Sequence, residues 1–283
     1  MGILSKDIIE KWILPHLPVG KRGFSIGVPL EELVECILHR LKTGCQWREL
    51  PTRQFFVSGR VLDWTTVYYH FNKWSKAGCW EKIWISILMH YQEYLDLSSI
   101  EIDGSHTPAK NGGEAVGYQG RKACKTSNAL FISDSQGVML AMSTPQEGQH
   151  HDLFEIQSLF DELCTILKEA GIDLEGLFLN ADAGFDSEGF KEACQKEDIF
   201  PNVKPNPRNS SKNEDREPYQ NGTHIFDEKL YEKRTVIEHA NAWIDGFKAL
   251  LVRFEFKKQN WVALHYIAFV IIFLRKINKL KKV

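Results

Sequence analysis

The sequence has few of the features that mark an exported or zinc-binding protein. Its six cysteines form no CxxC pair, and several lie in apolar helical patterns, where a free thiol packs as a small hydrophobic group. This pattern predicts a reduced, cytoplasmic protein without a zinc knuckle. The first residues, MGILSKDIIEKW, include acidic side chains and no signal-peptide core, so we expect no secretion signal.

Long hydrophobic runs are also absent. The longest, Trp261–Leu274, has 14 residues and includes His265. A membrane span needs about 20 apolar residues. The run therefore predicts a buried helix, and no membrane partner is expected.

The chain lacks a strong net charge, but its charges are unevenly distributed. The formal net charge is −2, yet residues 152–198 contain 13 acidic and 3 basic side chains, and residues 244–283 contain 9 basic and 2 acidic ones. An acidic middle beside a basic tail is typical of a metal site near a nucleic-acid surface. On charge alone, solvated helix faces of opposite sign explain the pattern better.

Helical periodicity dominates the first hundred residues. Apolar residues from Leu30 to Leu41 recur every 3.6 positions, and Thr43-Gly44 ends the pattern. Asp63 is placed to cap a second helix, and a third covers residues 80–91. We predict an all-α domain over residues 1–97.

A different pattern begins near Ser98 and predicts a mixed five-stranded sheet flanked by helices. The hairpin within residues 129–145 must be antiparallel, whereas the alternating strands and helices after it favour parallel pairing. The expected strands are 98–103, two within 129–145, 174–182 and 199–205; the expected helices are 152–171, capped by Asp152, then 187–198, 227–251 and 261–280. A polar loop is expected near 206–226. The second predicted domain is residues 98–283.

Three carboxylates fall where this sheet would build a site. Asp103 and Asp182 each end a predicted strand beside a glycine-containing turn, and Glu238 lies on the long helix with Tyr231 and Arg234 on the same face. Carboxylate oxygens suit Mg²⁺, and two such ions can clamp the attacking and leaving oxygens of a phosphoryl displacement. Taken singly, each aspartate is better explained as a turn residue and the glutamate as an ion-pair partner of the arginine.

Several blocks of the sequence resemble the DDE transposases of bacterial insertion sequences of the IS4/IS5 type, and the IS5 group in particular. The catalytic blocks of that family resemble EIDGSHTPAK (101–110), FLNADAGFDS (178–187) and YEKRTVIEHANAWIDGFKALLVRFE (231–255). Its helical head resembles CQWRELP (45–51) and DWTTVYYHFNKWSKAGCW (63–80), and its middle resembles residues 118–152. The blocks occur in the family's order and cover most of the chain.

The resemblance implies an RNase H-like catalytic domain that uses Mg²⁺ or Mn²⁺, two ions at a time. It implies that Asp103, Asp182 and Glu238 hold these metals. Tyr231 and Arg234 match the supporting residues of the family's Y-x2-R-x3-E-x6-K signature.

One position of that signature departs from the family. Asp245 stands where the family has lysine, and Lys248, rotated by about 60° on the helix, is a candidate replacement. Asp245 itself is then a candidate ion-pair partner on the Glu238 face.

Basic side chains elsewhere are candidates for contacts with DNA phosphates. An exposed charged hairpin explains those between the first two strands equally well. The helix at 63–77 is a candidate for the reading helix of a helix-turn-helix. The candidates are Lys73, Lys76, Arg121, Lys122, Lys125, Lys204, Arg208 and Lys212.

His150, His151 and Asp152 form a short run that could suggest a metal site. Neighbouring histidines in a strand point in opposite directions, and zinc needs further ligands at suitable spacing. We therefore expect no metal site of their own there, although the loop that carries them could lie near the active site.

Together these observations predict a DNA transposase. It would hydrolyse a phosphodiester at the transposon end and transfer the 3′-OH into target DNA. Its partners would be the double-stranded terminal inverted repeats and target DNA, with a homodimer or larger assembly on the bacterial nucleoid. The alternatives are a non-catalytic DNA-binding regulator and a carboxylate-pair hydrolase acting on sugars.

Overall fold

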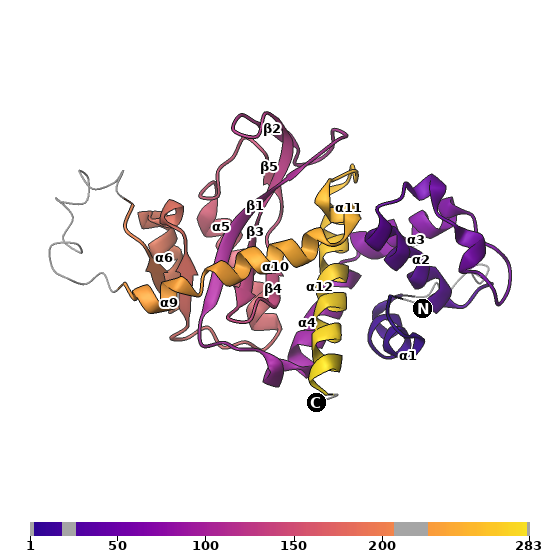
Figure 1. The fold of residues 1–283 in the computed structure, drawn as a ribbon, viewed down its shortest axis with the longest axis horizontal. Helices are drawn as coiled ribbons and strands as arrows, with labels where there is room; N and C mark the ends of the chain where they lie inside the picture. Colours follow the sequence, from indigo (N-terminus) through magenta and orange to yellow (C-terminus); the bar gives the residue numbers. More distant parts are fainter. Residues whose placement is uncertain (1–2, 19–26, 207–225, 282–283) are drawn as a thin grey trace. The chain divides into compact units, whose positions relative to one another are not determined.

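The computed structural model describes residues 3–18, 27–206 and 226–281. The chain divides into two compact units (Figure 1). Unit 1 comprises Met1–His90, Thr107–Glu114 and Trp243–Val283, and unit 2 comprises Tyr91–His106 and Ala115–Ala242. Contacts therefore divide the chain differently from a single boundary at residue 98.

Helices build unit 1, as the sequence predicts. Gly44 ends α2 with a left-handed φ of 67°, a conformation that glycine adopts without strain. Asp63 caps α3 by accepting the Thr65 N–H at 2.9 Å. The helices are α1 (Lys6–Ile8), α2 (Leu30–Thr43), α3 (Trp64–Lys76), α4 (Cys79–His90), α11 (Lys248–Leu251) and α12 (Lys258–Leu280), with a π-helical turn at Ile9–Ile13.

The last helix belongs to the core of unit 1. α12 packs against α2, α3 and α4, and Trp84 of α4 meets the rings of Phe269 and Phe273 at centroid distances of 5.8 and 5.7 Å. By length and composition α12 could cross a membrane, but 78% of its most apolar window is buried inside the protein. The buried helix predicted around Trp261–Leu274 is confirmed.

A buried polar group ties distant parts of unit 1 together. Glu255 accepts hydrogen bonds from Arg40 at 3.1 Å and from the Trp47 indole at 3.0 Å. Arg253 donates to the backbone carbonyl of Glu114 at 2.7 Å. Breaking such a buried pair leaves an uncompensated charge, so these contacts fix how the C-terminal segment docks.

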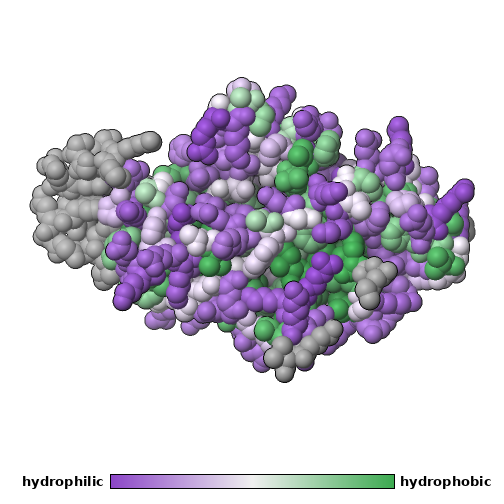
Figure 2. Space-filling model, viewed as in Figure 1, coloured by the Kyte–Doolittle hydropathy of each residue, from purple (hydrophilic) through white to green (hydrophobic). Residues whose placement is uncertain are grey.

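Surface chemistry is mixed. Hydrophilic side chains cover most of the face drawn in Figure 2, and hydrophobic ones gather in a few places. In unit 1 the exposed large apolar side chains include Leu251, Phe254 and Phe256.

The sheet of unit 2 contains the five predicted strands and two short additional ones. Its order is β2-β3-β1-β6-β7, with β4 and β5 both paired to β3. The predicted count of five is too low because β2 and β5 have only three and two residues, too few to show an alternating pattern. The strands are β1 (Ile100–Pro108), β2 (Gly117–Gln119), β3 (Cys124–Asp134), β4 (Met139–Met142), β5 (Gln146–Glu147), β6 (Phe178–Ala181) and β7 (Phe200–Val203).

Strand directions agree with the predicted mixed sheet. β3 and β4 are antiparallel, whereas β6 is parallel to both β1 and β7. The register places Glu101 beside Asn180. Because side chains alternate along a strand, Asp103 and Asp182, two residues further on, project from the same face at the same end of the sheet.

Two helix predictions in this region are wrong. The helix expected over 227–251 consists of α9 (Glu228–Glu232), α10 (Thr235–Asp245) and α11. The Arg234 N–H bonds to the Tyr231 carbonyl at 3.0 Å, three residues back, and this tighter turn interrupts the α-helical pattern. A second break falls at Gly246, a poor helix former.

The helix predicted over 152–171 also begins later than expected. α5 covers Ile156–Glu169 and its N-terminal flanking residue is Glu155. Asp152 therefore does not cap it. By contrast α6 (Glu188–Lys196) begins after Ser187, whose hydroxyl accepts the Phe190 N–H at 3.3 Å, as predicted.

Candidate active site

Asp103 lies on β1 at the end of the parallel pair. Burial, followed by the carboxylates of Asp152 and Asp182, raises the pKa of its carboxyl to about 7, while Arg234 acts in the opposite direction. The site thus holds more negative charge than its surroundings compensate. Such an excess is the electrostatic condition under which a carboxylate binds a cation.

Asp182 follows the last residue of β6. Its Oδ1 accepts the Gly184 N–H at 2.7 Å and so caps the turn Ala183–Phe185. The predicted turn role is confirmed, and the same carboxylate also raises the pKa of Asp103. Asp186, four residues on, is bound to Lys191 at 2.6 Å and is structural.

The supporting residues gather around the break between α9 and α10. Arg234 pairs with Glu238 at 3.3 Å, and its guanidinium centre lies 5.7 Å from the Tyr231 ring. The side chain of Glu238 is 58% exposed. Solvent screens this pair, so its carboxylate is available for exchange with another cation.

A row of asparagines joins these helices to the sheet. Asn202 on β7 donates to the Asn180 side chain at 2.7 Å, and Asn180 on β6 donates to the Leu230 carbonyl at 3.0 Å. The Asp227 N–H returns a bond to Asn202 at 2.8 Å. The strand that leads to Asp182 therefore also anchors α9.

The sequence interpretation did not identify these asparagines as important. The signal was present, because a polar residue stood in the middle of each of two strands that otherwise looked buried. Buried amides need hydrogen-bond partners, and here the partner is the backbone at the start of α9.

Comparison with known proteins decides the family. Residues 10–84 match a family described as "Putative transposase of IS4/5 family", and residues 54–273 match the family "Transposase DDE domain". The chain belongs to the DDE transposase family. The resemblance to DDE transposases of the IS4/IS5 type is thereby confirmed, and the assignment to the IS5 group stays a prediction.

Individual proteins match over part of the chain or at low identity. Over 104 residues the chain is 29% identical to the "Insertion element IS402 uncharacterized 16.2 kDa protein" of Burkholderia cepacia; the match covers 36% of this chain and 61% of that protein. The catalytic domain of Mos1 mariner transposase aligns with 67% of this chain and 88% of its own, at 10% identity and a TM-score of 0.29. The Mos1 mariner paired-end complex with Mn aligns with 94% and 86%, at 11% identity and a TM-score of 0.30.

The donor groups of this DDE transposase domain fit a divalent cation in chemistry. Asp103 and Asp182 supply the hard oxygen ligands that Mg²⁺ prefers. In the described residues, however, no three His, Cys, Asp or Glu side chains converge on one point that could hold a metal. Glu238 is paired with Arg234 instead, so binding of a cation by all three requires that pair to separate.

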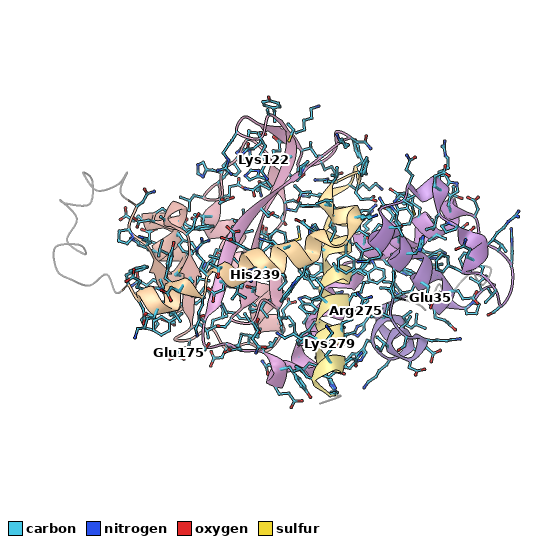
Figure 3. All side chains as sticks on the ribbon, viewed as in Figure 1. Glu35, Lys122, Glu175, His239, Arg275 and Lys279 are labelled. Atoms are coloured by element: carbon cyan, nitrogen blue, oxygen red, sulfur yellow. The ribbon has the colours of Figure 1, made fainter. Side chains whose placement is uncertain are left out.

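The remaining predicted residues lie in several places. Figure 3 shows Lys122 near the β2–β3 turn and His239, the neighbour of Glu238, on α10. The Lys122 ammonium donates to the His106 carbonyl at 2.7 Å, which occupies it within the sheet. Exposed residues are Lys73 and Lys76 on α3, Arg121 and Lys125 beside that turn, Lys204 after β7, Asp245 at the end of α10 and Lys248 on α11; Arg208 and Lys212 lie outside the described residues.

Proposed function

We propose that the chain is a DNA transposase whose Asp103, Asp182 and Glu238 hold two divalent cations. The observation that carries the proposal is the placement of two carboxylates at the same end of adjoining parallel strands. Burial is the main cause that raises the pKa of Asp103 to about 7, and the carboxylates of Asp152 and Asp182 add to it. When bound, Mg²⁺ or Mn²⁺ would activate water and stabilise the charge that develops on the phosphate.

Water would attack a phosphodiester at the transposon end. A new P–O bond forms to the water oxygen, the P–O3′ bond breaks, and the products are a 3′-OH and a 5′-phosphate. That 3′-OH would then attack a phosphodiester of the target, forming a new P–O bond and releasing a target 3′-OH. Phosphodiester bonds are exchanged in the second step, so it needs no further energy source.

Arg234 has a positioning role in this scheme. It pairs with Glu238 at 3.3 Å and also lowers the pKa of Asp103, so it lies between the helix and the sheet components of the site. Tyr231 supports it through its ring. Separation of the Arg234–Glu238 pair would free the glutamate for a cation and the arginine for a phosphate.

DNA recognition is assigned to basic side chains away from these acids. Lys73 and Lys76 on α3, with Arg121 and Lys125, offer exposed cations for phosphate contacts. Residues 1–97 would contact the terminal repeats and residues 98–283 would perform catalysis. Cleavage of two ends in one event calls for at least a dimer on the DNA, and the cytoplasmic nucleoid is the expected location.

Substitution of one carboxylate tests the proposal. Asp182→Asn should retain binding to end DNA and lose Mg²⁺-dependent cleavage. Asp173→Asn, an exposed aspartate of the same unit that accepts a backbone N–H in a turn, is the matched control and should cleave normally. Full cleavage by the Asp182 variant would rule the mechanism out, and a wild-type chain that binds ends but never nicks them with Mg²⁺ or Mn²⁺ would be a regulator.

A further inference from the structure

A fourth carboxylate reaches the candidate site from a loop between strand and helix. The carboxyl group of Asp152 lies directly against Gly104, the residue that follows Asp103. A Cβ built on Gly104 would overlap that carboxyl group. Only glycine lets the backbone at position 104 come so close to the Asp152 carboxyl group. The φ of Gly104 is not in the left-handed region, so this close approach, and not backbone conformation, requires glycine here.

Asn128 holds Asp152 in this position. Its side-chain amide donates to Asp152 Oδ1 at 2.8 Å from the buried strand β3, where Asn128 is only 3% exposed. Its own Oδ1 is buried and finds no hydrogen-bond partner among the described residues. A buried amide oxygen left unsatisfied costs free energy, so this arrangement points to a group beyond those of the protein.

The loop that carries Asp152 is fixed on both sides. His150 stacks on Phe154 with ring centroids 3.6 Å apart, and His151 Nδ1 accepts the Leu153 N–H at 3.1 Å. Glu155 has a left-handed φ of 51°, which is strained for this residue type. These contacts present the carboxylate to the sheet instead of leaving it as a helix cap.

We propose that Asp152 binds a divalent cation together with Asp103, and that Gly104 and Asn128 hold it in place for this purpose. The inference rests on the proposed function, since it adds a carboxylate to the same site. The carboxylates of Asp103 and Asp152 carry like charges that repel each other, and Asn128 supplies one hydrogen bond that holds Asp152 against Gly104. A divalent cation with oxygen-preferring chemistry supplies the missing positive charge.

Binding of Mn²⁺ to the full-length chain tests this without reference to cleavage. Free Mn²⁺ would be followed by electron paramagnetic resonance in a titration of the wild type, Asp152→Asn, Gly104→Ala and the control Asp173→Asn. The Asp152 and Gly104 variants should each bind at least about tenfold more weakly, and the control should match the wild type. Gly104→Ala keeps every carboxylate, so weaker Mn²⁺ binding by this variant reports on the position of the Asp152 carboxylate and not on total charge.

The outcomes separate this inference from the proposed function. Wild-type Mn²⁺ affinity in Asp152→Asn overturns the inference, even where Asp182→Asn abolishes cleavage and the proposed function stands. Absence of Mn²⁺ binding by the wild type also overturns it. Weakened binding in a chain that never cleaves DNA would keep the cation site and remove the transposase mechanism. Thermal unfolding in EDTA checks that each variant is folded; should Asp152→Asn fail to fold, Gly104→Ala decides.

Discussion

At the scale of single residues, a carboxylate buried beside two others retains its proton at a higher pH than an exposed one. Asp103 shows this effect, with a pKa raised from 3.8 to about 7, first by burial and then by its acidic neighbours. Under the proposed function, a cation bound at Asp103 would offset the free-energy cost of its buried negative charge. Active sites commonly hold such unfavourable groups, which the rest of the fold must compensate.

The pH dependence of stability follows from the sign of that shift. Between about pH 4 and 7 the folded chain holds a proton on Asp103 that the unfolded chain releases, so stability falls as pH rises through this window. Asp103→Asn removes the effect. At pH 8 without metal the variant should be more stable than the wild type by on the order of 2 kcal/mol, with a smaller difference at pH 4.5.

Urea unfolding at the two pH values measures this difference. Asp173→Asn serves again as the control, since it removes an exposed carboxylate. Equal stability differences at pH 4.5 and 8 would show that Asp103 does not titrate as its surroundings indicate.

Some residues of the candidate site could be predicted from the sequence, and others could not, for identifiable reasons. Asp103 and Asp182 were predictable because each follows a local strand pattern, and parallel strands bring their ends together. Asp152 was predicted to cap a helix, because an aspartate directly before a helical pattern is explained by that local role alone. Its contact with Gly104 spans 48 positions in the sequence, and no local pattern encodes such a distance.

At the scale of elements, the asparagine row decides where the helix bearing Arg234 and Glu238 lies against the sheet. Asn202→Ala removes the donors to Asn180 and to the Asp227 carbonyl and leaves buried acceptors unpaired. We expect a loss of about 1–3 kcal/mol in unfolding free energy. We also expect faster amide hydrogen exchange across α9, where the anchoring bonds are lost.

Denaturant unfolding and hydrogen exchange by mass spectrometry provide the two readouts. Asn241→Ala, on α10 and outside the row, is the matched control. Faster exchange throughout unit 2 with no preference for α9 would mean that the asparagines contribute only general stability.

The break between α9 and α10 shows a limit of pattern reasoning at this scale. Helical periodicity continues through Lys233 and Arg234, so the sequence predicted one uninterrupted helix. The structure tightens the chain there, and the tertiary anchors at Asn180 and Asn202 outweigh the local preference for a regular helix. Strands, turns and most caps were predicted because their signals are local.

At the scale of the whole molecule, unit 1 depends on segments from both parts of the sequence. α12 supplies the core partner of α4, and Glu255 pairs with Arg40 across 215 positions. A fragment of residues 1–97 lacks both. It should therefore show little cooperative thermal unfolding, whereas the full chain should unfold with a sharp transition.

Circular dichroism during heating tests this expectation. The control is a mixture of the 1–97 fragment with a separately produced 98–283 fragment. Addition of the second fragment should restore the helical signal of the first. Cooperative unfolding of residues 1–97 alone would instead support an independent domain that ends at residue 97.

The dependence on α12 has a consequence for synthesis. The ribosome makes residues 258–280 after all the strands of unit 2, so the helices made first wait for the helix made last before their core can close. A chain cut short by a premature stop codon before α12 would carry the strands of unit 2 and an unfinished unit 1. The order of translation thus ties completion of the proposed DNA-reading helices to the synthesis of α12.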